Sequence, residues 1–236
     1  MKRIGLLGGM SWESTALYYQ LLNQGVAERL GGLHSADCVL RSVDFALVAR
    51  LQAEGRWDEA GDMLADDARS LQAAGAELLL LCTNTMHKVA ATIQDAVDIP
   101  LLHIVDVTAD AARRAGTTRL GLLATGFTME QPFYRERMAT HGLDVLVPDA
   151  PGRELVHRVI YEELCRGIFT DVAREQVAGV LADLVARGAE GVILGCTEIE
   201  LLIGQGDSPV PVLPTTALHA AAALDAALGS SEDPAP

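Results

Sequence analysis

The feature that most constrains the fold of this chain is a stretch of sequence that occurs twice. Residues 75–85 read Gly-Ala-Glu-Leu-Leu-Leu-Leu-Cys-Thr-Asn-Thr, and residues 188–198 read Gly-Ala-Glu-Gly-Val-Ile-Leu-Gly-Cys-Thr-Glu. Each copy has a turn, a short apolar run and then a Cys-Thr step into polar residues. Such a run is typical of a strand buried on both faces, so polar side chains are expected where the strand ends.

The repeat covers most of the chain. Three further landmarks recur in the same order, namely residues 3–11 as 119–128, Tyr18 as Tyr134, and Pro100-Leu-Leu as Pro211-Val-Leu. The sequence therefore predicts a duplicated α/β unit, with a site built from equivalent positions of the two halves.

Apolar runs alternate with helical patterns along the chain. Strands are expected at 2–7, 37–43, 77–82, 100–106, 119–124, 143–147, 191–195 and 210–213. The longer helices are expected at 12–30, 58–74, 86–97, 153–166, 171–187 and 215–228. This alternation predicts mainly parallel sheets flanked by helices, with ligands bound at the carboxyl ends of the strands.

The duplication also predicts the domain organisation, which is two similar α/β domains related by a pseudo-twofold axis. The first domain is expected to contain residues 1–98 and 210–228, and the second residues 99–209. Residues 229–236 are expected to form a disordered tail.

Composition and charge exclude several classes of partner. Half of the residues are hydrophobic, which is ample for a buried core, and the formal net charge is −14. Nucleic acids and anionic membranes repel such a charge, so neither is expected as a partner. The apolar run at the start is too short for a signal peptide, and no segment is long enough to span a bilayer. We expect a cytoplasmic protein with reduced thiols.

The cysteines do not indicate a metal site. Cys38, Cys82, Cys165 and Cys196 show neither the C-x-x-C spacing nor the Cys/His clustering of zinc sites, so no metal is expected. Cys38 and Cys165 lie in apolar patterns and are interpreted as buried small hydrophobes. Cys82 and Cys196 instead come at the ends of the repeated strands.

Equivalent positions in two halves suit a chemistry that needs two facing groups. If a twofold axis relates the halves, residues 83 and 196 face each other across a cleft. Inversion of a stereocentre needs one group that removes a proton from carbon and a second that returns a proton to the opposite face. A thiol, whose pKa of roughly 8.5 is lowered near helix N-termini, can act as the base or as the acid.

Four motifs resemble the signatures of the aspartate/glutamate racemases, which work without pyridoxal phosphate. They are residues 8–15, 31–36, 82–87 and 194–199, which read GGMSWEST, GGLHSA, CTNTMH and LGCTEI. The resemblance extends to about residue 228. It implies two similar α/β domains with a cleft between them, a homodimer, and two-base racemisation of an amino acid such as aspartate or glutamate, with no cofactor and no metal.

One position departs from the family pattern. The family's catalytic cysteine directly precedes Asn-Thr, whereas here Thr83 holds that position and Cys82 comes one residue earlier. Counting from the glutamate of each Gly-Ala-Glu also pairs Thr83 with Cys196. Neighbouring side chains of a strand point to opposite faces, so a regular strand would bring Thr83 to the site. A local bulge would bring Cys82 instead, and both outcomes stay open.

The residue in this position decides the mechanism. A threonine hydroxyl is too weak an acid to exist as an alkoxide base, although it can relay or donate a proton. The resemblance implies that Cys196 takes the proton from the L-enantiomer. We therefore expect Cys196 to deprotonate an L-amino acid and Thr83 to help reprotonate the other face, so that turnover starts readily from L and poorly from D.

Other residues are expected to support this chemistry. The backbone N–H groups of Asn84, Thr85 and Thr197, near helix starts, can hold the α-carboxylate and the developing negative charge. Glu198 would orient the ammonium group, adjust the thiol, or serve only as a helix cap. Further substrate-binding candidates, in turns around the expected cleft, are Met10, Ser11, Gln52, Thr125 and Thr128.

Substrate identity is the least constrained part of the prediction. Lys88 is the single cation that adjoins the matched motifs, and it is expected on an outward helix face; Arg50, Arg56 and Arg166 are distant candidates. A side-chain carboxylate needs such a partner, so acidic specificity rests on the resemblance. His87 is interpreted as a helix residue beside the site, and His103 as a core or hinge residue.

Two other functions stay open. One keeps the fold and Cys196 but changes the reaction, as in relatives of this family that isomerise maleate, racemise hydantoins or decarboxylate malonates. The other is a non-catalytic protein that binds small carboxylates, which needs a cleft but no thiol.

Overall fold

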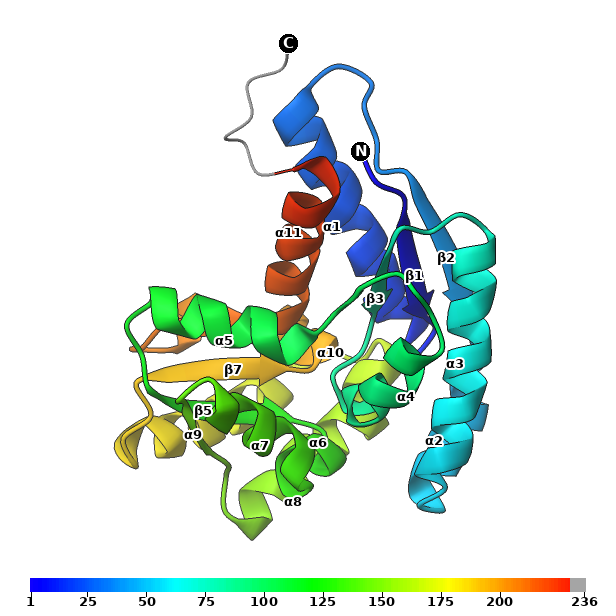
Figure 1. The fold of residues 1–236 in the computed structure, drawn as a ribbon. Coiled ribbons are helices and arrows are strands. Elements are labelled where there is room, and N and C mark those ends of the chain that lie inside the picture. The colour runs from blue at the N-terminus through cyan, green and yellow to red at the C-terminus, as the bar shows by residue number, and fades with distance from the viewer. Residues whose placement is uncertain (230–236) are drawn as a thin grey trace. The chain divides into compact units, whose positions relative to one another are not determined.

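The computed structural model describes residues 1–229, so residues 230–236 of the expected tail lie outside the described part of the chain. The chain divides into two compact units. Unit 1 contains residues 1–103 and the chain from His219 onward, and unit 2 contains Ile104–Leu218. Figure 1 shows the strands and helices of each unit.

Unit 1 is built on a four-stranded parallel sheet in the order β2-β1-β3-β4. The two central strands, β1 and β3, are apolar and fully buried, as expected for strands that are covered on both faces. The strands are β1 (Ile4–Gly8), β2 (Cys38–Ser42), β3 (Leu78–Leu81) and β4 (Leu101–Leu102).

Helices cover both faces of this sheet because alternate strand residues point to opposite sides. Ile4, Leu6 and Leu80 pack with α1 (Trp12–Leu30) and α11 (Thr215–Leu228). Figure 1 shows α1 and α11 side by side, and a Cβ on Gly25 would lie 2.3 Å from Leu224, so the glycine permits this close approach. The opposite face packs against α2 (Phe45–Ala53), α3 (Trp57–Ala73) and α4 (Ala90–Asp95), with a 3₁₀ turn at Thr85–Val89 between β3 and α4.

Unit 2 repeats this plan, with a parallel sheet in the order β6-β5-β7-β8. Its strands are β5 (Arg119–Ala124), β6 (Asp144–Leu146), β7 (Gly191–Gly195) and β8 (Val212–Pro214). Its helices are α5 (Ile104–Arg114), α6 (Gly126–Glu130), α7 (Pro132–Thr140), α8 (Ala150–Arg158), α9 (Asp171–Ala186) and α10 (Thr197–Leu202). Taken in chain order, the strands of the two sheets correspond one to one. The predicted fold class, two similar α/β domains with parallel sheets, is confirmed.

The structure corrects the expected strand at 100–106. The strand β4 contains only Leu101–Leu102, and α5 begins at Ile104. From this point the buried residues, including Ile104, Thr108 and Ala111, follow helical spacing. The apolar run is therefore the end of a strand joined directly to an amphipathic helix.

The expected domain boundaries also change, because sheet membership depends on pairing. The short β4 pairs with β3, so the chain passes from unit 1 to unit 2 after His103 rather than after residue 98. The strand predicted at 210–213 pairs with β7 of unit 2, so the chain returns to unit 1 after Leu218 rather than before residue 210.

Two expected helices are interrupted. The helix predicted at 86–97 is a 3₁₀ turn followed by the short α4. The helix predicted at 153–166 begins at Ala150 and passes at Val159–Glu163 into a π-helical turn.

The central strands predict where unit 1 is most sensitive to mutation. Leu80→Ala removes a fully buried side chain and should lower the free energy of unfolding by about 2–5 kcal/mol. Leu40→Ala, on the half-exposed side chain of β2, should change it by only about 0.5 kcal/mol. Both tryptophans, Trp12 and Trp57, lie in unit 1, so urea unfolding followed by their fluorescence reports on this unit. Equal losses in the two variants would contradict this account of the core.

Candidate functional site

A tight turn follows β1 and starts α1. Gly9 has a φ of +89°, and a Cβ there would lie 2.4 Å from the backbone of Val43, so only glycine fits. The N–H of Gly9 donates to Thr15 Oγ1 at 2.8 Å, and Ser11 caps α1 by accepting from the N–H of Ser14 at 3.2 Å. Of the predicted candidates here, Ser11 is engaged in this cap and Met10 is buried in the core of unit 1.

The end of β3 separates the two candidates for the first catalytic position. The Cys82 side chain is fully buried with Tyr18 and Leu22 in the core that faces α1, and its thiol points to the Leu80 carbonyl at 3.8 Å. Burial raises the pKa of this thiol far above its ordinary value. Thr83, the next residue, is half-buried. A regular strand end therefore favours Thr83 over Cys82 as the group that can meet a substrate.

The turn after Thr83 brings several predicted residues together. Asn84 and Thr85 are buried at the start of the 3₁₀ turn. Gln52, from α2, lies with its Nε2 3.0 Å from the sulfur of Met86 in the same turn. In addition, the ring of His87 donates from Nδ1 to the carbonyl oxygen of Thr83 at 2.7 Å. His87 is thus tied directly to the segment that carries Thr83.

The end of β5 carries the equivalent turn of unit 2. Thr125 caps the short α6, and its Oγ1 lies 3.2 Å from the Oγ1 of Thr128 and accepts from that residue's N–H at 3.4 Å. The N–H of Gly126 donates to Nδ1 of His157 at 3.0 Å. Both predicted threonines therefore lie in one polar turn at the carboxyl end of the sheet.

Cys196 follows β7 and forms the N-cap residue of α10. Its thiol is 8% exposed and donates to Oε2 of Glu198 at 2.9 Å. Burial, the negative charge of Glu198 and the neighbouring Cys165 together raise the pKa of Cys196 well above its ordinary value. The expectation that a helix start lowers this pKa is wrong, because α10 is short and desolvation and the adjacent carboxylate dominate.

One of the roles considered for Glu198 requires contact with Cys196, and the structure shows this contact. This carboxylate is 4% exposed and contacts the thiol directly, so it is more than a helix cap. It accepts the hydrogen bond of the thiol and raises the pKa of Cys196.

Three hydrogen bonds hold α10 against the start of α11 within unit 2. Thr197 Oγ1 lies 2.9 Å from Thr216 Oγ1. Glu200 accepts from the N–H of Thr216 at 2.8 Å and from Thr215 Oγ1 at 3.3 Å. Burial raises the pKa of Glu200 to about 7. Glu200 therefore fixes the position of the segment that carries Cys196.

Two of the four cations considered as substrate ligands, Arg56 and Lys88, contact other groups of the protein. Arg56 forms ion pairs with Glu54 and Glu59 at 2.6 and 2.5 Å. The ammonium group of Lys88 lies 4.0 Å from the centre of the Trp57 ring. Neither is an available partner for a substrate carboxylate in this conformation.

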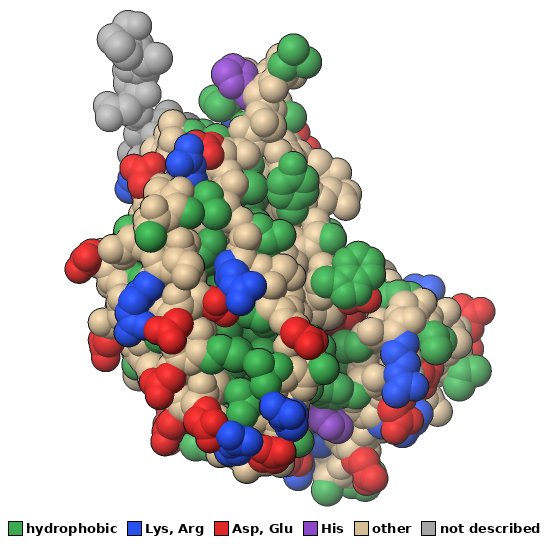
Figure 2. Space-filling view, turned by 90° about the vertical axis from the view of Figure 1, so that its right-hand side faces the viewer, with side chains coloured by type: hydrophobic (Ala, Val, Ile, Leu, Met, Phe, Trp, Pro, Cys, Tyr) green, Lys and Arg blue, Asp and Glu red, His purple; other side chains and the backbone are tan. Residues whose placement is uncertain are grey.

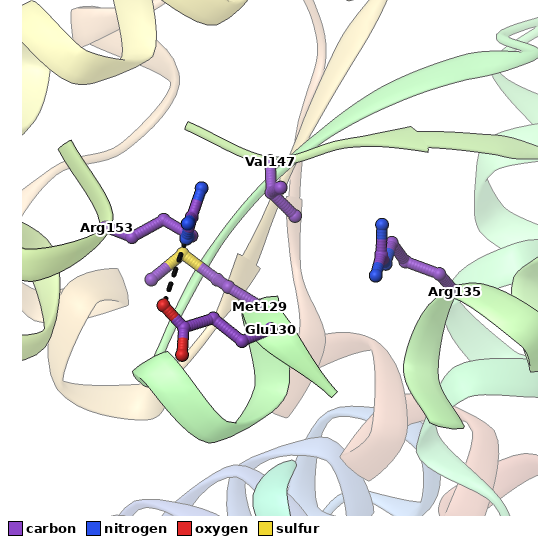
Figure 3. Close-up of a pocket in the computed structure, with 5 residues that line it drawn as sticks. All are labelled: Met129, Glu130, Arg135, Val147 and Arg153. Carbon is purple, nitrogen blue, oxygen red and sulfur yellow. Dashed lines mark hydrogen bonds and ion pairs between the residues drawn. The ribbon is translucent and has the colours of Figure 1, made fainter. Parts of the chain in front are cut away.

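Unit 2 contains a pocket of about 380 Å³ that includes none of the predicted site residues (Figure 3). It is lined by Met129, Glu130, Arg135, Val147 and Arg153, and Arg153 pairs with Glu130 at 3.1 Å. Within residues 1–229, no cluster of three or more His, Cys, Asp or Glu side chains has a metal-binding arrangement. Over the same residues, no helix is long and apolar enough to cross a membrane.

Comparison with known proteins assigns the family. The family model for Asp/Glu/hydantoin racemases matches residues 7–223. The chain belongs to the Asp/Glu/hydantoin racemase family.

Solved structures and a curated relative agree with this assignment. A proposed Asp/Glu racemase from Yersinia pestis is 52% identical, with a TM-score of 0.90 over 97% of this chain and 100% of that one. An aspartate racemase homologue from Pyrococcus horikoshii is 32% identical, with a TM-score of 0.84 and the same coverage. The broad-specificity amino-acid racemase RacX from Bacillus subtilis is 20% identical over 91% of this chain and 93% of its own length.

Sequence reasoning missed one group of residues in this protein. Burial raises the pKa of the Tyr161 hydroxyl. Negative charge on Cys196, Cys165 or Glu198 raises it further, since these groups lie close to that hydroxyl. The ring of His157 lies 4.7 Å from that of Tyr161. The signal was present in the sequence, since residues 157, 161 and 165 recur every four residues and so share a helix face. Cys165, expected to be a buried hydrophobe, is only half-buried, and so is Cys38.

The thiol–carboxylate contact predicts how Cys196 reacts. Glu198→Gln removes the charge that raises the pKa of Cys196, so the pKa should fall and more thiolate should be present at a given pH. Alkylation of Cys196 by iodoacetamide, followed by peptide mass spectrometry between pH 7 and 10, should then show a midpoint at lower pH. The control is Glu175→Gln, on an exposed residue of α9, which should match the unmodified protein. An unchanged or higher midpoint in Glu198→Gln would contradict the assigned electrostatic role.

Proposed function

We propose that this protein racemises an amino acid, L-aspartate or L-glutamate, without pyridoxal phosphate, by removing a proton from the α-carbon and returning one to the opposite face. The observation that carries the proposal is the Cys196 thiol, which ends β7 in contact with Glu198. Its repeat equivalent, Thr83, ends β3 of the other unit. Membership of the racemase family supports the same reaction.

Cys196 is the proposed base. Its raised pKa means that the thiol form predominates before substrate arrives. A substrate ammonium group placed against Glu198 would neutralise the carboxylate, and the thiolate would then be less strongly disfavoured. As the substrate binds, the thiol would release its proton to solvent, and the resulting thiolate would take the α-proton of the L-enantiomer.

Thr83 is proposed to act on the opposite face. A hydroxyl can donate or relay a proton, but as an alkoxide it would be far too unstable to start the reaction from the D-enantiomer. The proposed turnover is therefore asymmetric and begins readily from L. Partial exposure of Thr83 and burial of Cys82 support this choice.

The remaining candidates are proposed to hold the α-carboxylate and stabilise the carbanion. Fixed hydrogen-bond donors aimed at a developing charge supply a large part of enzymatic rate enhancement. Buried polar groups at the ends of β1, β3, β5 and β7 meet this requirement in each unit. They are Ser11, Asn84, Thr85, Thr125, Thr128 and Thr197, with Met10 and Gln52 as packing neighbours.

The choice of aspartate or glutamate rests on the relatives. The structures with 52% and 32% identity are described in terms of aspartate or glutamate, whereas RacX is described as broad in specificity. Arg56 pairs with Glu54 and Lys88 lies over the ring of Trp57, so neither is proposed to bind the side-chain carboxylate of the substrate.

Cytoplasmic location and a homodimer are also part of the proposal. Within residues 1–229, none of the four cysteines forms a disulfide, which suits a reducing compartment. Large apolar side chains reach the surface of unit 1, where Tyr19 is 53% exposed and Leu33 fully exposed. The N–H of Ala36 donates to Asn23 at 3.0 Å and ties the loop of Leu33 to α1. Figure 2 shows hydrophobic side chains among charged ones on the face drawn. Such surface favours association with a second copy.

Racemisation is tested on both enantiomers of a panel of amino acids. We expect deuterium from D₂O to enter the α-position of L-aspartate or L-glutamate, followed by the D-enantiomer, with NMR and chiral chromatography as readouts. Cys196→Ala should lower both rates by roughly 10²–10⁴-fold. Cys82→Ala should keep turnover from L, as should the control Cys38→Ala.

Three other outcomes would contradict parts of this account. Equal rates from L and D that are abolished by Cys82→Ala would mean that two thiols operate. Normal rates in Cys196→Ala would place the base elsewhere. An absence of exchange with every amino acid would favour another reaction of the family or a carboxylate-binding protein.

The homodimer is tested by sedimentation velocity at micromolar concentration. The unmodified protein should sediment as a dimer, and the double variant Tyr19→Asp/Leu33→Asp should sediment as a monomer because it places charge in the proposed apolar contact. The control is Val172→Asp, which alters a side chain of unit 2 that is 64% exposed and should leave the dimer intact. A monomeric unmodified protein would refute the dimer, and a dimeric double variant would move the interface away from α1.

A further inference from the structure

His157 contacts the turn that carries Thr125 and Thr128. Gly126 is the first residue of α6, so its N–H has no acceptor within that helix, and it donates to Nδ1 of His157 at 3.0 Å. The two residues are packed closely, since a Cβ built on Gly126 would lie 3.3 Å from the same Nδ1. The start of α6 is therefore fastened to a side chain of α8.

This hydrogen bond fixes the tautomer of His157. A backbone N–H can only donate, so Nδ1 accepts with its lone pair and the neutral ring carries its proton on Nε2. Burial lowers the pKa of His157, while the negative charge of Glu130 acts in the opposite direction. Within residues 1–229, Glu130 is the one charged group that shifts this pKa. The ring is therefore neutral near pH 7, and a proton added to Nδ1 would break the contact with Gly126.

The imidazole of His157 also contacts Tyr161, four residues further along the chain. Their ring centres lie 4.7 Å apart, with the ring planes tilted by 48°. Burial raises the pKa of the Tyr161 hydroxyl, and negative charge on the nearby Cys196 and Glu198 raises it further. His157 thus links the turn of Thr125 at the end of β5 to the tyrosine beside the thiol at the end of β7, all within unit 2.

The turn that His157 holds presents two buried hydroxyl groups. Thr125 is 8% exposed and Thr128 fully buried, and their Oγ1 atoms lie 3.2 Å apart. Two neighbouring hydroxyls can donate to the two oxygens of one carboxylate, and they bind it best when their positions are fixed before the ligand arrives. Loss of the acceptor at His157 would leave the N–H of Gly126 unpaired and release the start of this turn.

We propose that neutral His157 is a positioning residue for racemisation, which holds the Thr125 and Thr128 hydroxyls where they bind the α-carboxylate of the substrate. This inference rests on the proposed function. His157 neither takes nor gives a proton in the reaction; it acts through the backbone N–H of Gly126, so its effect appears in substrate binding. The contact needs an unprotonated Nδ1, so it persists at pH 7 and is lost in acid, as the pH falls through the lowered pKa of His157.

Two substitutions separate the hydrogen bond from the rest of the side chain. His157→Leu removes the acceptor, so amide hydrogen exchange in the peptide of residues 124–130, followed by mass spectrometry, should be faster than in the unmodified protein. The same variant should raise the KM for the L-enantiomer roughly 10-fold, while kcat changes by less than about threefold. His157→Asn places its Oδ1 near the position of Nδ1, so it can still accept from Gly126 and should restore both the exchange rate and the KM.

The pH profile gives a second readout, because asparagine does not titrate. The ratio of kcat/KM for His157→Asn to that for the unmodified protein should rise as the pH falls from about 7.5 to about 5, since only the unmodified protein loses its acceptor. The control is His34→Asn, on an exposed loop residue, for which this ratio should stay constant and the peptide of residues 124–130 should exchange normally.

Three results would overturn the inference. Unchanged amide exchange in His157→Leu would show that the imidazole does not hold the turn. Faster exchange with an unchanged KM would show that the turn does not serve substrate binding, and equal losses in His157→Leu and His157→Asn would show that the side chain only fills space. An unmodified protein that racemises no amino acid would refute the proposed function and with it the positioning role, while amide exchange would still decide whether His157 holds the turn.

Discussion

The structure depends on pairs of parallel strands that are buried on both faces and end at one edge of a sheet. In unit 1, Leu7 of β1 is in register with Leu81 of β3, and in unit 2 Ala124 of β5 is in register with Gly195 of β7. Burial of both faces fixes these registers, because a shift by one residue would turn every side chain to the opposite face. The residues that follow the strands are therefore delivered at fixed positions, and both Thr83 and Cys196 owe their places to this constraint. The same constraint turns Cys82 into the core.

What the sequence predicted well follows from local signals. The strands at 119–124 and 191–195 are uninterrupted apolar runs bounded by turns, and the structure confirms both bounds. The strand at 100–106 failed because two elements join without a turn, so that strand and helix share one apolar run. The strand at 210–213 was recognised, but its sheet was not, because pairing with β7 is a tertiary property that no local pattern encodes.

The candidate site was likewise predicted only in part. The repeat singled out Cys196 and Thr83 as candidates, since each follows the equivalent strand of its unit. The contacts of Cys196 with Glu198, and of Glu200 with Thr216, arise from how α10 meets its neighbours, and their geometry is absent from the sequence. The contacts among the rings of His87, His103 and His219 are the clearest case of geometry that the sequence does not show. These residues stand far apart in the chain, and only the neighbouring positions of β3 and β4 and the return of α11 to unit 1 bring their rings together.

The two units thus carry different groups, Thr83 and Cys196, at equivalent positions of the repeat. A thiol beside a carboxylate is a poor base in isolation, because the adjacent negative charge and the buried setting both disfavour the thiolate. That penalty is removed only when a cation reaches the carboxylate, and an amino acid brings its own ammonium group. A hydroxyl is a poor acid and a worse base, so the proposed role of Thr83 is only to donate or relay a proton. Under the proposed reaction, a thiol in one half and a hydroxyl in the other give an enzyme that is faster from the L-enantiomer than from the D-enantiomer.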